Sequence, residues 1–147
     1  MKKYFSPFRI ATYLLAVTFV GHTAGGMLAQ KSLGPASDAV FASMKAVHFN
    51  FNGADATWYG FWFGFGLTLS VMLLFSAILA WQLDKVPPDR WPLVSVVAWA
   101  FAASQLASAL LAFKYFFLGP AILTLAVAVL LTAGNLRKRK QRSPAPA

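Results

Sequence analysis

The stretch of sequence that decides the fold runs from Trp58 to Leu83 and reads WYGFWFGFGLTLSVMLLFSAILAWQL. It contains no Asp, Glu, Lys or Arg. A helix rises about 1.5 Å per residue, so about 20 mostly apolar residues are enough to cross a hydrocarbon core of ~30 Å. The stretch is therefore predicted to be a membrane-spanning helix.

Three further segments meet the same criterion: 7–29, 91–113 and 119–136. In the last of them Pro120 falls in the first turn, where its missing N–H costs nothing. We therefore predict an all-α integral membrane four-helix bundle over residues 1–136, with spans at about 7–29, 58–83, 91–113 and 119–136. Residues 137–147 are predicted to form a basic, disordered cytoplasmic tail.

The composition supports this class. Apolar residues make up 59% of the chain and charged residues only 12%, about half the share in soluble domains. There is no cysteine, which excludes disulfides, thiolate metal sites and dithiol redox chemistry.

The basic residues predict the orientation, because Lys and Arg gather on the cytoplasmic side of membrane helices. One side of the predicted bundle carries Lys2, Lys3, Arg9, Lys85, Arg90, Arg137, Lys138, Arg139, Lys140 and Arg142. The other side carries only Lys31, Lys45 and Lys114. Both termini are therefore expected in the cytoplasm, and topology rather than nucleic-acid binding explains the net charge of +9.

An alternative for the first segment is a cleaved signal peptide with Lys2 and Lys3 as its basic end. Its apolar stretch exceeds the ~7–15 residues that are usual in such peptides. The orientation of the other three spans would be unchanged by cleavage.

The outer loop, residues 31–57, is predicted to contain a short amphipathic helix. Ser37 is the expected N-cap, with Asp38 in the first turn. Its apolar face comprises Val40, Phe41, Met44 and Val47, which recur at helical spacing. Such a helix either lies on the membrane surface, caps the bundle or forms a lid over a site.

His22 is the one titratable residue well inside a predicted span, about 20 Å above the inner interface. An ionisable residue within a membrane is a candidate for function. Five further polar residues lie at similar depth and complete a candidate polar pocket: Thr18, Thr23, Gln105, Thr68 and Thr124. The alternative is that these groups only hydrogen-bond between helices.

Small residues mark helix faces that allow close packing. They are Gly25, Gly26, Gly60, Gly64, Ser104 and Ser108. We expect contacts within the bundle there, with a contact between subunits as the alternative.

Several of these residues resemble the motif of a family of small four-helix bacterial inner-membrane proteins to which no activity is assigned. The resemblance rests on Gly21-His22-Thr23, on Met44 in the outer loop, and on the aromatic and glycine-rich start of the second helix at 58–67. It implies the same fold and a multi-pass location in a bacterial inner membrane. It also makes His22 and Thr23 candidates for a functional role, because they belong to the motif. It implies no activity.

The sequence therefore favours a non-enzymatic protein that binds a lipid or another hydrophobic molecule, or that assists a membrane partner. One alternative is a membrane enzyme acting on a lipid or quinone, with His22 as general base. Another is a haem-binding electron carrier using His22 and His48, which a Soret band would reveal. We expect no cofactor and no nucleic-acid partner. The sequence is compatible with a hydrophobic ligand, with a homo-oligomer and with a membrane-protein partner, and does not decide among them.

The orientation is testable with reporter fusions. A reporter fused after residue 50 should be active only if it is of the kind that functions outside the cytoplasm, because residue 50 lies in the predicted outer loop. A fusion after residue 142 should show the opposite behaviour. Cytoplasmic activity after residue 50 would contradict the four-span topology.

Overall fold

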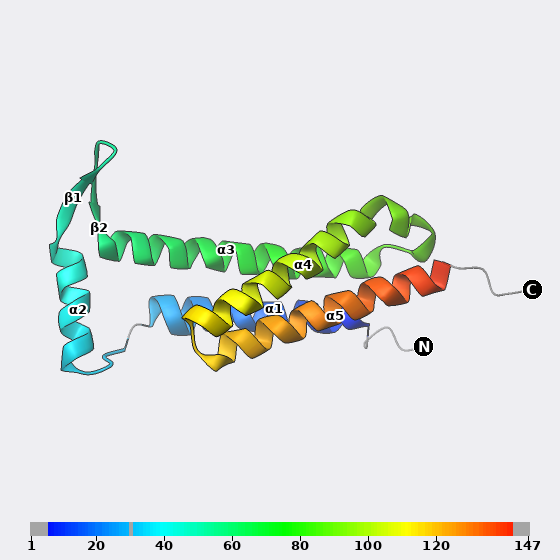
Figure 1. Cartoon of the computed structure of the whole chain (residues 1–147), viewed down its shortest axis with the longest axis horizontal. Coiled ribbons are helices and arrows are strands. Elements are labelled where there is room, and N and C mark those ends of the chain that lie inside the picture. The colour runs from blue at the N-terminus through cyan, green and yellow to red at the C-terminus, as the bar shows by residue number, and fades with distance from the viewer. Residues whose placement is uncertain (1–5, 30, 143–147) are drawn as a thin grey trace, which may run out of the picture. The chain divides into compact units, whose positions relative to one another are not determined.

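The computed structural model describes residues 6–29 and 31–142 (Figure 1). Within them, four helices are long and apolar enough to cross a membrane: Pro7–Leu28, Trp58–Lys85, Pro88–Tyr115 and Leu118–Gln141. Each overlaps one of the predicted spans. The prediction of four membrane-length helices is thus confirmed.

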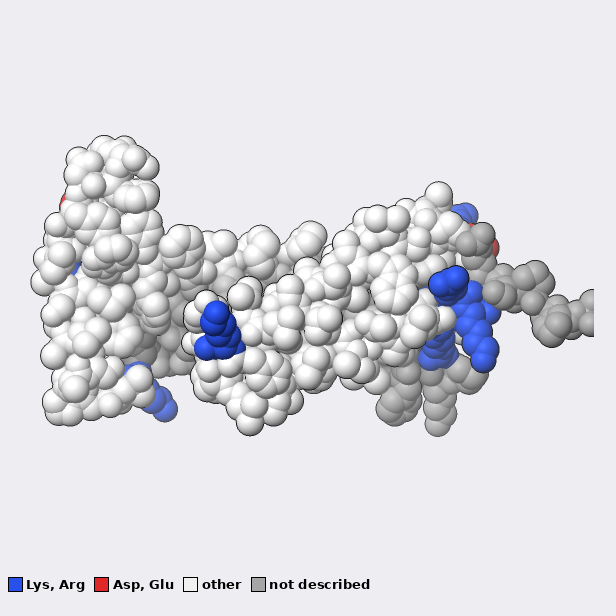
Figure 2. Space-filling view, viewed as in Figure 1, with Lys and Arg blue, Asp and Glu red and all other residues white. Residues whose placement is uncertain are grey.

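The elements follow in the order α1 (Pro7–Val20), η2 (Gly21–Leu28), α2 (Pro35–Ala46), β1 (His48–Phe51), β2 (Ala54–Thr57), α3 (Trp58–Lys85), η3 (Pro88–Arg90), α4 (Trp91–Tyr115) and α5 (Leu118–Arg142). The disorder predicted from residue 137 is wrong for residues 137–142, because α5 continues through them. Residues 143–147 lie outside the described part. Figure 2 shows Lys and Arg gathered at the C-terminal end of α5, whereas the sides of α4 and α5 are largely uncharged.

The helix α2 begins earlier than the sequence predicted. Its N-cap is Gly34 at φ 104°, and Pro35 occupies the first turn, so Ser37 is not the cap. Glycine adopts this positive φ without strain, and the fixed φ of proline suits the first helical position. Asp38 lies in the first turn as predicted.

The predicted apolar face of α2 is only partly covered. Phe41 and Met44 are half-buried. In contrast, Val40 and Val47 are 59% and 51% exposed. No residue of α2 is fully buried, so the helix leaves apolar surface for contacts beyond its own chain.

A β-hairpin follows α2, within the segment 31–57 that was predicted as an outer loop with a short helix and no strands. Its strands are antiparallel, with His48 opposite Thr57 and Phe51 opposite Ala54. The turn residues Asn52 and Gly53 have φ values of 54° and 89°. Two-residue hairpin turns of this kind require positive φ at both positions, which is why Asn-Gly is a strong hairpin signal.

The described chain divides into two compact units. The first unit contains the residues up to Thr18 and those from Leu74 onward, and the second contains 19–73. In the first unit α4 and α5 run antiparallel and form the main helix–helix contact (Figure 1). The largest fully buried side chains all belong to this unit: Phe8, Leu15, Val127, Leu131 and Asn135.

A polar cluster ties three helices of the first unit together at one end. The Arg9 guanidinium donates to the Asp84 carboxylate at 2.6 and 3.0 Å, and the Ser6 hydroxyl donates to the other oxygen of that carboxylate. The guanidinium also lies 4.4 Å from the centroid of the Trp81 ring. From α5, Lys138 donates to the main-chain carbonyl of Asp84 at 3.1 Å.

Gly134 allows a close helix contact with Phe8 in this unit, and its substitution tests the packing. A Cβ at Gly134 would lie 2.6 Å from an edge carbon of the Phe8 ring, which is 1% exposed and has no room to move. We expect Gly134→Ala to lower stability by about 1–3 kcal/mol from overpacking, reduced by up to ~1 kcal/mol through better helix propensity. Thermal unfolding in detergent measures the difference.

Gly64→Ala is the matched control, because a Cβ there meets no atom within 4 Å. Its melting temperature should be unchanged or slightly raised. Equal melting temperatures for the two variants would show that Phe8 does not pack against Gly134.

Candidate functional site

His22 lies in η2, a π-helix rather than an α-helix. The hydrogen bond from the Ala29 N–H to the Ala24 carbonyl, 3.0 Å long, spans five residues, as π geometry requires. The sequence analysis assumed α-helical geometry across 7–29, which is wrong for Gly21–Leu28. Short π segments are frequent at functional sites.

The π-helix contacts α3 at Gly66. The Nε2 atom of His22 lies 3.0 Å from the Gly66 carbonyl oxygen, and because a carbonyl only accepts, Nε2 carries the proton. In the neutral ring Nδ1 is then an acceptor. It lies on the side of Gly26, 3.9 Å from where a Cβ of Gly26 would be.

Met27 packs against the same point of α3. It is 5% exposed, and a Cβ added at Gly66 would collide with the end of its side chain. Met27 follows His22 by five residues, which is about one turn of a π-helix. In an α-helix the two side chains would point about 140° apart, so the π geometry is what brings both onto Gly66.

Most predicted pocket hydroxyls are bonded within their own helix. Thr18, Thr68 and Thr124 each donate to the main-chain carbonyl four residues earlier, at 2.7, 2.9 and 2.7 Å. Thr23, inside the π-helix, has a buried hydroxyl with no hydrogen-bond partner among the described residues. The three bonded hydroxyls have used their protons and are not free donors for a ligand.

The six residues of the predicted polar pocket divide between the two units. His22, Thr23 and Thr68 belong to the second unit, and Thr18, Gln105 and Thr124 to the first. Gln105 is half-buried on α4. The convergence of all six around one ligand stays a prediction.

The six small residues predicted to mark packing faces are exposed: Gly25, Gly26, Gly60, Gly64, Ser104 and Ser108. The glycines that a neighbouring side chain from another helix does cover are Gly66, under Met27, and Gly134, under Phe8. A contact with a second subunit at the exposed six stays a prediction.

A pocket of about 810 Å³ in the second unit adjoins the His22 helix. One wall is the end of η2 and the segment after it, and another is a face of α2. The lining residues are Gly25, Gly26, Ala29, Lys31, Ser32, Leu33, Asp38, Phe41, Ala42, Lys45 and Trp62. Its volume is within the usual range of about 300–1,000 Å³ for ligand sites. We call it the η2–α2 pocket.

This pocket was not predicted from the sequence, although one signal for it exists. Asp38, Phe41, Ala42 and Lys45 have the spacing i, i+3, i+4 and i+7, which places them on one face of α2. The ring of Phe41 meets that of Trp62 from α3 edge-on, with centroids 5.2 Å apart. Both rings line the pocket.

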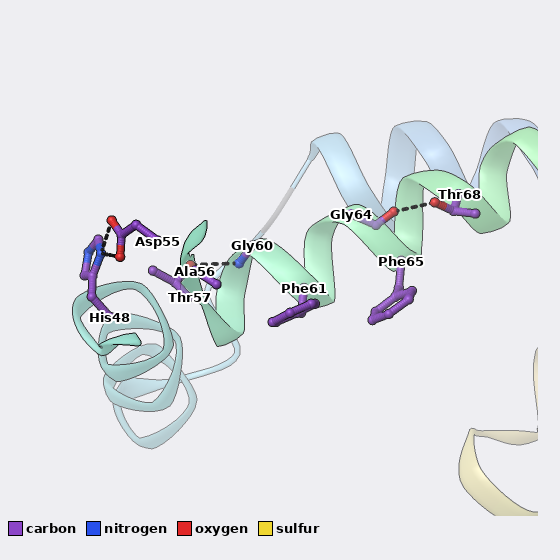
Figure 3. Close-up of a pocket in the computed structure, with 9 residues that line it drawn as sticks. All are labelled: His48, Asp55, Ala56, Thr57, Gly60, Phe61, Gly64, Phe65 and Thr68. Atoms are coloured by element: carbon purple, nitrogen blue, oxygen red, sulfur yellow. Dashed lines mark hydrogen bonds and ion pairs between the residues drawn. The ribbon is translucent and has the colours of Figure 1, made fainter. Parts of the chain in front are cut away.

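A second, more open hollow of about 530 Å³ runs along α3. Figure 3 shows Phe61 and Phe65 projecting from the same side of α3, with the His48–Asp55 pair at the hairpin end. The Nδ1 atom of His48 lies 2.9 and 3.0 Å from the two oxygens of Asp55. Both side chains are mostly exposed, at 59% and 73%.

Within residues 6–29 and 31–142, no three His, Asp or Glu side chains are grouped so as to hold a metal ion. No family model, curated protein or solved structure matches the chain. The resemblance to the family of small inner-membrane proteins therefore stays a prediction. By its fold the chain belongs to the class of α-helical proteins with four membrane-length helices.

The contribution of His22 to folding is testable by two substitutions. His22→Gln keeps a donor for the Gly66 carbonyl and should change stability by less than ~1 kcal/mol. His22→Leu removes the donor and should cost about 0.6 kcal/mol and at most ~1.7 kcal/mol, the average and the maximum measured for hydrogen bonds between membrane helices. Thermal unfolding in detergent compares both with the parent. A His22→Leu variant as stable as the parent would show that this bond contributes nothing to folding.

Proposed function

We propose that this protein binds a lipid, without catalysing a reaction, in the η2–α2 pocket. It would do so as a multi-pass protein of a bacterial inner membrane, with both termini in the cytoplasm and α2 at the outer surface. The observation that carries the proposal is the pocket itself, where charged and apolar side chains line one space. An amphiphile matches such a lining, because its headgroup and its chain need opposite environments.

The position of the pocket supports a lipid rather than a water-soluble ligand. Phe41 and Trp62 line it, and Trp62 lies in the second turn of the membrane-length helix α3. Aromatic residues at helix ends mark the headgroup level of a membrane. Leu33, which lines the pocket, is 79% exposed, and Val40 on α2 is 59% exposed, as expected for side chains that meet lipid.

The polar groups near the pocket do not form a catalytic set. His22 uses Nε2 to hold Gly66, and the carboxylate of Asp38 accepts the Ser32 hydroxyl at 2.6 Å. Nε2 is therefore engaged and not free to ligate haem iron. A binding role requires no more than the shape and the lining of the pocket.

A lipid-modifying enzyme is the second candidate, and Nδ1 of His22 is the observation that favours it. This atom is an acceptor on the side of Gly26, which lines the pocket. A general base must lie within hydrogen-bond reach of the proton it removes. Recovery of the bound lipid in altered chemical form would favour the enzyme, and recovery unchanged favours binding alone.

Filling the pocket tests the proposal. Ala42→Trp places a large ring in the pocket from α2, and native mass spectrometry of the purified protein measures the phospholipid that it retains. We expect one retained lipid per chain in the parent and an occupancy at least fivefold lower in Ala42→Trp.

Ala36→Trp is the matched control, because Ala36 is exposed on the same helix and does not line the pocket. It should retain lipid like the parent, and both variants should melt like the parent. Equal lipid retention in the parent and in Ala42→Trp would mean that the pocket is not the lipid site.

A further inference from the structure

We infer that the η2–α2 pocket selects phospholipids whose headgroup carries a net negative charge, with Lys31 and Lys45 as the residues that bind its phosphate. This inference rests on the proposed lipid site and adds the chemical class of its ligand. Both lysines line the pocket, one from the segment after η2 and one from the last turn of α2.

The two ammonium groups are not neutralised within the described chain. The ion pairs among the described residues are Arg9–Asp84 and His48–Asp55, and neither involves a pocket lysine. Lys45 instead lies over the ring of Tyr59, with Nζ 4.5 Å from its centroid. A cation on an aromatic face keeps its charge and its hydrogen-bond donors for a further partner.

The carboxylate in the pocket does not cancel these charges. Asp38 accepts the Ser32 hydroxyl at 2.6 Å, and it lies in the first turn of α2, where the helix dipole stabilises a negative charge. The negative charge of Asp38 is therefore partly stabilised by the dipole of α2 and by the hydrogen bond from Ser32. The three charged side chains leave the pocket with a net charge of +1.

An anionic phosphate is the headgroup that fits two ammonium groups. Lysine binds phosphate as a point charge with three donors, and its bonds to an ionised oxygen are stronger than neutral ones. The apolar lining, Leu33, Phe41 and Trp62, gives a free phosphate ion nothing to contact. A phospholipid uses both parts, with its phosphate at the lysines and its glycerol and upper chain along the apolar wall.

Lipid selectivity tests the inference. The protein is loaded with phosphatidylglycerol or phosphatidylcholine of identical acyl chains, and native mass spectrometry measures the occupancy of each. A lysine near a membrane surface adds roughly a fivefold preference for anionic lipid. We expect the parent to prefer phosphatidylglycerol by at least fivefold. In Lys31→Gln/Lys45→Gln the two lipids should bind equally, because the occupancy of phosphatidylglycerol falls by more than that of phosphatidylcholine, whose choline already compensates the charge of its phosphate.

Lys31→Gln/Lys114→Gln is the matched control. It removes the same number of charges, and Lys114, like Lys45, lies over a tyrosine ring, 5.2 Å from the centroid of Tyr115, but it does not line the pocket. It should keep more of the preference than the pocket double variant. Melting temperatures equal to the parent's show that each variant is folded.

The outcomes separate this inference from the proposed function. Equal binding of both lipids by the parent, with both reduced by Ala42→Trp, overturns the selectivity and leaves the lipid site standing. Binding that Ala42→Trp does not reduce overturns the lipid site as well. Displacement of phosphatidylglycerol by millimolar inorganic phosphate would identify a free anion as the ligand and also overturn the inference. No displacement by phosphate is the expected result.

Discussion

The structure depends on one constraint, the absence of water in a hydrocarbon core. Backbone N–H and C=O groups there must be paired within the chain, and a helix pairs them within one segment. Two buried side-chain donors follow the same requirement: Thr12 donates to a carbonyl of its own helix at 2.9 Å, and the Asn135 amide donates to the Ala98 carbonyl at 3.1 Å. The Thr23 hydroxyl and the Oδ1 of Asn135 are buried without a partner among the described residues. The ion pair between Arg9 and Asp84 lies at helix ends, where charges cost least.

The π-helix meets this constraint and also changes what the segment can do. Its five-residue bonds keep the backbone paired while they turn His22 and Met27 onto Gly66. Gly25 and Gly26, in the same π-helix, line the η2–α2 pocket. The same short segment therefore supplies both a helix contact and part of the lining of the pocket.

The glycines show how far a residue type predicts its role. Gly64 and Gly66 lie on the same helix two residues apart, yet only Gly66 has a side chain from another helix over it. The small-residue pattern identifies faces on which close approach is permitted. Which of those faces is used depends on the side chain opposite, and that side chain comes from a distant part of the sequence.

The sequence by itself determined the helical class, the number of membrane-length helices and their ends to within a few residues, because these follow from apolar length, which is a property of consecutive residues. The Asn52-Gly53 pair is also a sequence signal for the hairpin turn, although the segment around it was interpreted as a loop. The π geometry at Gly21–Leu28, the Gly34 cap of α2, the tautomer of His22 and the lining of the pocket were decided only by the tertiary structure. Each of these depends on pairing between segments far apart in the chain, such as His22 with Gly66, or on small differences in backbone geometry, and hydrophobic periodicity contains neither.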